Sequence, residues 1–198
     1  MSTHSPQAPP RTAAAADLEI IRATQRWVER AVIGLNLCPF ARAPYVQQRV
    51  HFRVSRAQET EVLLDDLREE LVALQAADPQ SRETTLLIHP GVLGDFLAYN
   101  DFLDLADASV RALGLEGELQ IASFHPDYRF AGSADDAIEN CSNRSPYPTL
   151  HLLREASIAH AVETLADTGD IYRRNVETLR KLGVDGWRAL MRDDSLAT

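Results

Sequence analysis

The sequence predicts an α/β fold: a small, mainly parallel sheet of three to four strands, with flanking helices and a helical C-terminal extension. One observation is that apolar segments with the period of a strand alternate along the chain with segments that have the period of a helix. Another is that segment 84–88 is almost entirely apolar or β-branched, as buried parallel strands are. Such alternation is typical of βαβ units with right-handed crossovers.

The first half of the chain supplies two helices and two strands. Apolar side chains recur at helical spacing over 17–35, and Pro39 ends that helix because the residue before a proline leaves the helical region. Alternation over 50–54 predicts a half-buried strand, and 60–77 an amphipathic helix. Segment 84–88 is then the second strand.

The second half is expected to be mostly helical. The predicted elements are a helix over 95–113, a strand over 119–124, and helices over 148–166, over 170–182 and from 185 onward. Three strands make a small sheet, so a further edge strand is expected near 42–50 or 130–140.

Length and composition indicate one domain. Of the 198 residues, we expect 1–16, rich in Ala, Pro and Ser, to be a disordered tail and 17–198 to form a single α/β domain. A net charge of −9 argues against nucleic acid and anionic membranes as partners. Without an apolar run of ~18 residues, an export signal or a disulfide framework, the expected location is the reducing cytoplasm.

Two strands end in the dipeptide His-Pro. His89 follows the second strand and His125 the third, so parallel strands would bring both imidazoles to the carboxyl edge of the sheet, where α/β folds bind ligands. Each His is therefore a candidate catalytic residue. The alternative is that each bonds a backbone carbonyl and only closes a turn.

A second group of candidates follows the long loop 125–147. On the predicted helix, His151 and Glu155 lie one turn apart and Arg154 lies beside them. With His125, the first two form a ligand set that suits zinc or iron, or an acid–base group. The alternative is a hydrogen-bonded pair on the surface.

The loop also carries candidates for substrate binding. Asn143 and Arg144 lead into the predicted helix, whose N-terminus attracts anions, and an Arg fork matches a carboxylate or phosphate. Tyr128 and Arg154 complete the expected binding group for a small anionic molecule. Alternatively, Arg144 pairs with acidic side chains and fastens the loop.

Cys38 is the candidate nucleophile. It directly precedes Pro39, and a helical turn starting there would stabilise a thiolate through its N-terminus. The alternative is a buried structural cysteine, which is also the expectation for Cys141.

Four segments resemble a bacterial family of uncharacterised proteins, the domain of unknown function DUF1415. They are 31–41, 84–90, 123–128 and 143–155, and the resemblance covers roughly 17–190. It implies family membership and no particular activity. In that family the position of Cys141 is usually not Cys, which implies that Cys38 is the stronger candidate.

Three hypotheses for function remain open. The first is an enzyme that acts on a small anionic molecule at the carboxyl edge, with a divalent metal for hydrolysis or oxidation as one expectation. The second uses Cys38 as a nucleophile, with His89 or His125 as its base. The third is a binding protein without catalysis, whose polar loop recognises a partner.

Overall fold

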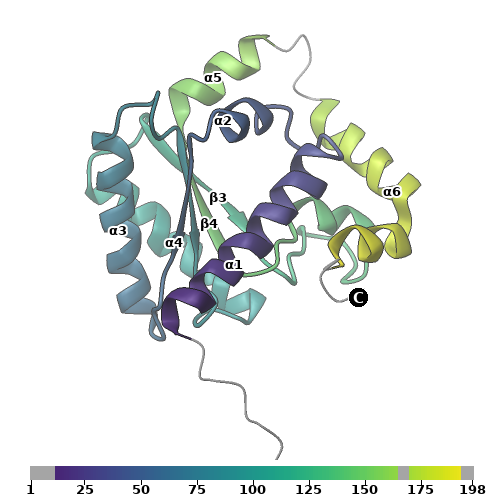
Figure 1. Ribbon diagram of the computed structural model, residues 1–198, viewed down its shortest axis with the longest axis horizontal. Coiled ribbons are helices and arrows are strands. Elements are labelled where there is room, and N and C mark those ends of the chain that lie inside the picture. The colour runs from purple at the N-terminus through teal and green to yellow at the C-terminus, as the bar shows by residue number, and fades with distance from the viewer. Residues whose placement is uncertain (1–11, 165–169, 193–198) are drawn as a thin grey trace, which may run out of the picture.

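The computed structural model describes residues 12–164 and 170–192, and it confirms an α/β fold (Figure 1). In chain order the elements are α1 Ala13–Trp27, the π-helix η1 Val28–Ile33, α2 Arg42–Val46, β1 Val50–Val54, α3 Thr60–Ala76, β2 Thr84–Ile88, α4 Phe96–Ala112, β3 Leu119–Phe124, the 3₁₀-helix η2 Ile138–Asn143, β4 Thr149–Arg154, α5 Glu155–Thr164 and α6 Asp170–Met191.

The sheet is mixed, so the prediction of a mainly parallel sheet was wrong. Its order is β1-β2-β4-β3: β1 and β2 pair in parallel, and β4 is antiparallel to both β2 and β3. The three strands predicted from the sequence therefore point the same way. The fourth strand runs against them from the middle of the sheet.

That fourth strand is the main error of the sequence-based prediction. Residues 149–154 were expected inside a helix over 148–166, and the extra strand was expected near 42–50 or 130–140. The helix begins only at Glu155. Leu150 and Leu152 are fully buried on one face of β4, so the segment alternates as a buried strand does.

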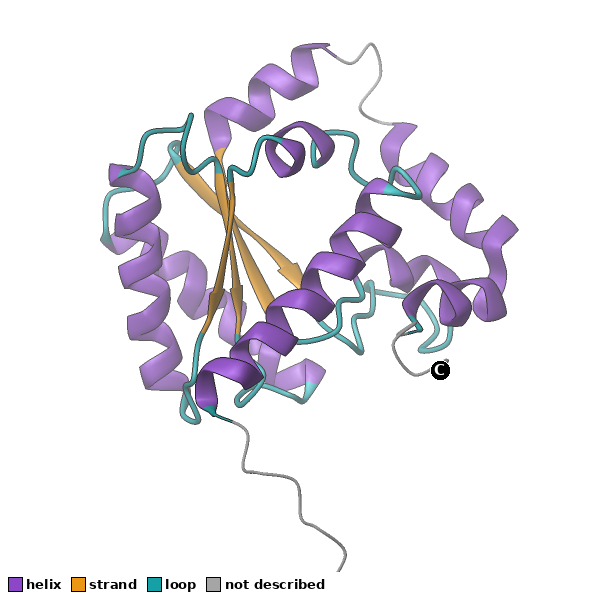
Figure 2. Ribbon diagram, viewed as in Figure 1, coloured by secondary structure: helices purple, strands orange, loops and turns teal. Residues whose placement is uncertain are grey.

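The helices cover the sheet in two layers (Figure 2). α3 and α4 pack on one face, where Leu63, Leu67, Leu71 and Leu74 of α3 are fully buried at helical spacing. α1 and η1 cross the other face, and α6 packs beside them and against η2. Trp27 of α1 meets Phe124 of β3 edge-on, with ring centroids 5.0 Å apart.

Both ends of the described chain are helical. α1 begins at Ala13, capped by the Thr12 hydroxyl, so the predicted tail 1–16 is too long; residues 1–11 lie outside the described residues. The C-terminal helical extension is confirmed as α6. Gly183, where a helix end was predicted, interrupts α6 with a φ of 68°. Among the described helices, none is long and apolar enough to cross a membrane.

Candidate functional site

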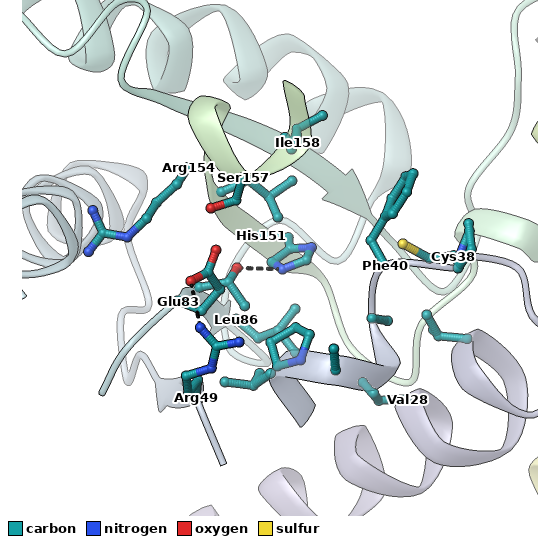
Figure 3. A pocket seen from close by; sticks show the side chains of 18 of the residues that line it. Val28, Cys38, Phe40, Arg49, Glu83, Leu86, His151, Arg154, Ser157 and Ile158 are labelled. Atoms are coloured by element: carbon teal, nitrogen blue, oxygen red, sulfur yellow. Dashed lines mark hydrogen bonds and ion pairs between the residues drawn. The ribbon is translucent and has the colours of Figure 1, made fainter. Parts of the chain in front are cut away.

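A cavity of about 620 Å³ lies on the α1 side of the sheet (Figure 3). Leu86 of β2, Phe124 of β3 and His151 of β4 form its floor. Its walls come from α1, η1, the loop after η1, α2 and α5, and the lining is mainly apolar. An apolar hollow of this size with a few polar groups has the usual character of a small-molecule site.

The cavity extends to the edge of the sheet opposite the predicted one. It reaches Arg49 and Glu83, which directly precede β1 and β2, and Arg154, which ends β4. His89 and His125 follow the other ends of β2 and β3. This polar end of the cavity therefore lies at the opposite edge of the sheet from the carboxyl edge, where the sequence predicted the site.

His151 stands on the cavity floor because odd positions of β4 face α1 while Leu150 and Leu152 face α3 and α4. Its Nε2 lies 2.7 Å from the hydroxyl of Thr84 on β2. The same hydroxyl donates to the carbonyl oxygen of Leu152 at 2.5 Å. The imidazole is thus tied to the sheet through one ring nitrogen.

The His151 imidazole is neutral at physiological pH, because burial lowers its pKa from 6.5 to about 4. Nδ1 has no hydrogen-bond partner in the described part of the chain. It is not one of the fully buried side-chain nitrogens that lack a partner, so it remains accessible to solvent. In Figure 3 this second nitrogen lies on the side of the ring away from the dashed hydrogen bond, toward Phe40 and Cys38. It faces the cavity.

Cys38 lines the same cavity, in the loop that follows η1. Burial raises the pKa of its thiol, and the backbone N–H groups of Phe40 and Ala41 act in the opposite direction. The predicted turn after Pro39 therefore supplies the expected amides, but burial has the larger effect. The resting thiol is protonated, which is the state of a poor nucleophile.

An ion pair forms the polar end of the cavity. Arg49 Nη1 lies 3.2 Å from Glu83 Oε2, and both side chains are largely buried, at 17% and 14% exposure. Arg49 also donates to the carbonyl oxygen of Pro79. The positive charge at this end is thus already balanced by a carboxylate.

Unpartnered polar atoms concentrate in the walls of this cavity. Within residues 12–164 and 170–192, four buried side-chain nitrogens have no hydrogen-bond partner: Trp27 Nε1, Arg49 Nε, Arg154 Nε and His89 Nε2. The first three belong to residues that line the cavity. Buried polar groups normally have hydrogen-bond partners, so it is unusual that three unsatisfied nitrogens belong to the lining of one cavity.

The carboxyl edge does hold His89 and His125, and both imidazoles contact neighbouring groups of the fold. Both imidazoles pack against the Tyr99 ring, with centroids 5.7 Å and 5.1 Å away. His89 Nδ1 donates to the Val92 carbonyl at 3.1 Å, and burial lowers the pKa of His89 to about 4. His125 Nε2 donates to the Leu93 carbonyl at 3.1 Å, which is the turn-closing alternative.

The loop candidates hold the loop together. Arg144 donates to the carbonyl oxygens of Tyr128 at 3.2 Å and Asp135 at 2.6 Å, so it fastens the loop through backbone rather than through acidic side chains. Asn143 Nδ2 donates to the Ser123 carbonyl at 3.2 Å. These contacts occupy the groups that were expected to bind an anion.

Arg154 has a similar structural role. Its guanidinium donates to the carbonyl oxygens of Leu74 at 2.6 Å and Ala77 at 2.7 Å, at the C-terminal end of α3. Helix C-termini leave such carbonyls without partners and favour positive charge. In Figure 3 the guanidinium points away from His151.

The three predicted metal ligands are not brought together. His125 follows β3 at one edge of the sheet, whereas Glu155 follows β4 at the other, about 23 Å away at ~3.3 Å per strand residue. His151 lies between them in β4 and is bonded to Thr84. Over the described ranges, no group of three or more His, Cys, Asp or Glu side chains is placed to hold a metal ion.

The sequence-based prediction missed Thr84 and the Arg49–Glu83 pair. A signal for the pair was present, because residues that directly precede two adjacent parallel strands lie side by side, and these two have opposite charges. Thr84 could be linked to His151 only once 149–154 was known to be a strand beside β2.

Comparison with known proteins identifies the family. The comparisons with curated proteins and with solved structures returned no match. Residues 19–189 match the family described as "Protein of unknown function (DUF1415)". The chain belongs to the DUF1415 family.

Proposed function

We propose that this protein binds a small, mainly apolar molecule in the cavity on the α1 side of the sheet. The observation that carries the proposal is the cavity itself: about 620 Å³, with a predominantly apolar lining and a neutral imidazole, His151, on its floor. Ligand sites of small molecules commonly have volumes of about 300–1,000 Å³ and this mixture of apolar walls and few polar groups.

The charges around the cavity favour a neutral ligand over the anionic one that the sequence suggested. Arg49 is paired with Glu83, and the guanidinium of Arg154 bonds the end of α3. Arg144 lies outside the cavity and bonds loop carbonyls. An anion would lose its hydration in this apolar space, and the guanidinium of Arg154 points away from His151, toward the carbonyl oxygens at the end of α3.

The proposal can be tested with a fluorescent apolar probe such as N-phenylnaphthylamine. We expect saturable binding at one site in the wild type. Ser157→Phe on α5 introduces a ring at a cavity-lining position and should weaken binding at least about tenfold, since a methylene-sized clash already costs of order 1–3 kcal/mol. Native mass spectrometry of the purified protein would detect a molecule that stays bound.

Ala159→Phe is the matched control, because Ala159 is an exposed residue of the same helix that does not line the cavity. It should leave probe binding unchanged. Equal binding by both variants would mean that the probe binds elsewhere, and no saturable binding by the wild type would refute the proposal.

A second candidate function is thiol chemistry, favoured by one observation: Cys38 and His151 line the same cavity. In this mechanism Cys38 Sγ adds to a carbonyl carbon of the ligand, the C=O π electrons move to the carbonyl oxygen, and the thiol proton passes through His151 Nδ1 to that oxygen. This candidate requires Cys38 to be alkylated faster than a free cysteine, and His151→Phe to slow that reaction. Equal alkylation rates in wild type and variant would eliminate it.

A further inference from the structure

We infer that the cavity selects ligands that donate a hydrogen bond, such as a hydroxyl, a phenol or an amide N–H, and that Thr84 imposes this selectivity by fixing the tautomer of His151. The inference rests on the proposed function and names the chemical class of the ligand. It depends on a short chain of hydrogen bonds that runs from β4 to β2 and back to β4.

This chain of hydrogen bonds ends at the backbone carbonyl oxygen of Leu152, which can accept a hydrogen bond but cannot donate one. The Leu152 carbonyl oxygen lies 2.5 Å from Thr84 Oγ1, a separation that requires a hydrogen between the two oxygens. A threonine hydroxyl has one hydrogen, so Thr84 donates it to Leu152. Without that hydrogen, two oxygen lone pairs would face each other at this distance.

The Thr84 oxygen is then an acceptor toward His151. Nε2 lies 2.7 Å from it, so Nε2 must carry the hydrogen of this bond. A neutral imidazole has one N–H, which leaves a lone pair on Nδ1. Because Nδ1 faces the cavity, the floor at His151 presents a hydrogen-bond acceptor and not a donor.

The sheet holds this arrangement in place. Thr84 is 5% exposed, and its strand position is fixed by pairing with Leu153 of β4. The doubly protonated imidazole, which would donate from both nitrogens, forms only near pH 4. At physiological pH the tautomer is therefore determined by the Thr84 hydroxyl.

This polarity distinguishes ligands of the same shape. A hydroxyl or N–H can point its hydrogen at Nδ1, whereas an ether, a ketone or a carboxylate would bring a lone pair against a lone pair. A hydrogen bond to Nδ1 stabilises the complex, and leaving the buried acceptor unsatisfied costs more than the bond contributes. We therefore expect a preference of about tenfold or more for the donor, which corresponds to ~1.4 kcal/mol.

The tautomer can be measured without any ligand. In ¹⁵N-histidine-labelled protein, long-range ¹H–¹⁵N correlation spectra should show His151 with a protonated Nε2 and an unprotonated Nδ1. Thr84→Ser keeps the hydroxyl and should keep this pattern. Thr84→Val removes it and should shift His151 toward the Nδ1–H tautomer. Nδ1–H in the wild type, or no change in Thr84→Val, would overturn the inference.

Selectivity is measured with naphthol and methoxynaphthalene, which differ in whether the oxygen carries a hydrogen. The wild type and Thr84→Ser should bind naphthol about tenfold more tightly, and Thr84→Val should lose this preference. Equal affinities in the wild type overturn the selectivity while leaving the proposed binding function intact. If neither probe binds, the proposed function fails and the selectivity fails with it, whatever tautomer the spectra report.

Discussion

Replacing His151 with phenylalanine should make the protein less sensitive to mild acid. The unfolded chain binds a proton at this histidine near pH 6.5, whereas the folded protein binds it only near pH 4. Between these values the unfolded state holds more protons, so the free energy of unfolding decreases as the pH falls from 6.5 toward 4. His151→Phe removes this contribution.

The size of the effect follows from the two pKa values. At pH 5 the unfolded-state value lies 1.5 units above the pH and the folded-state value lies below it. At about 1.36 kcal/mol per unit, His151 should account for a loss of about 2 kcal/mol between pH 7 and pH 5. His89, whose pKa burial also lowers to about 4, adds a loss of similar size that the variant retains.

Urea denaturation at pH 7 and at pH 5 measures the loss in each protein. The variant lacks the hydrogen bond to Thr84 at both pH values. The cost of removing that bond therefore cancels when the loss between pH 7 and pH 5 is compared between the variant and the wild type. Val72→Ala, which removes no titratable group at a half-exposed position of α3, is the control and should show the same loss as the wild type. If wild type and His151→Phe lose the same free energy between the two pH values, His151 is not held neutral by burial and the reasoning fails.

Three further predictions concern packing, helix termination and the thiol. Leu71→Ala empties a fully buried position of α3 and should cost about 2–5 kcal/mol in urea denaturation, whereas Val72→Ala, at a half-exposed position, should change stability by less than about 0.5 kcal/mol. Arg154→Met leaves carbonyls at the end of α3 without a donor and should cost about 1–3 kcal/mol, measured as a lower Tm by circular dichroism. Cys38 should react with iodoacetamide more slowly than free cysteine near neutral pH, because burial raises its thiol pKa; faster labelling by mass spectrometry would contradict this.

Most elements could be predicted from the sequence because their patterns are long or strongly periodic. The helices over 60–76 and 96–112 and the strands over 50–54, 84–88 and 119–124 match their predicted positions within two residues. The helix pattern of α3 is unambiguous because its buried leucines repeat over about three turns.

β4 could not be recognised in the same way. Its six residues run without a break into α5, and Leu, Arg, Glu and Ala are good helix formers, so a helical pattern continues through the junction at Glu155. What makes 149–154 a strand is pairing on both sides, with β2 and with β3, and that is tertiary information.

The site was harder to predict than the fold for a related reason. Polar side chains of the long loop resembled a ligand-binding group, but loops also need partners for their own backbone, and Arg144 supplies them. His151, a candidate chosen from the sequence, does line the cavity, but it lies on a strand rather than the predicted helix, and its neighbours differ from those predicted. Its partner, Thr84, lies 67 positions away in the sequence.

The central position of β4 has a consequence for how the chain folds. β2 and β3 have no direct contact in the sheet order, and the strand that joins them is the last to leave the ribosome. Until residue 154 has been synthesised, each of these strands presents an unpaired edge, which is the part of a sheet most prone to pair with another chain. Pairing partners such as Thr84 and Leu153 are also far apart in sequence, so closure of the sheet is expected to be slow. The edges of β2 and β3 on which β4 pairs therefore stay exposed to wrong pairing until β4 has been synthesised.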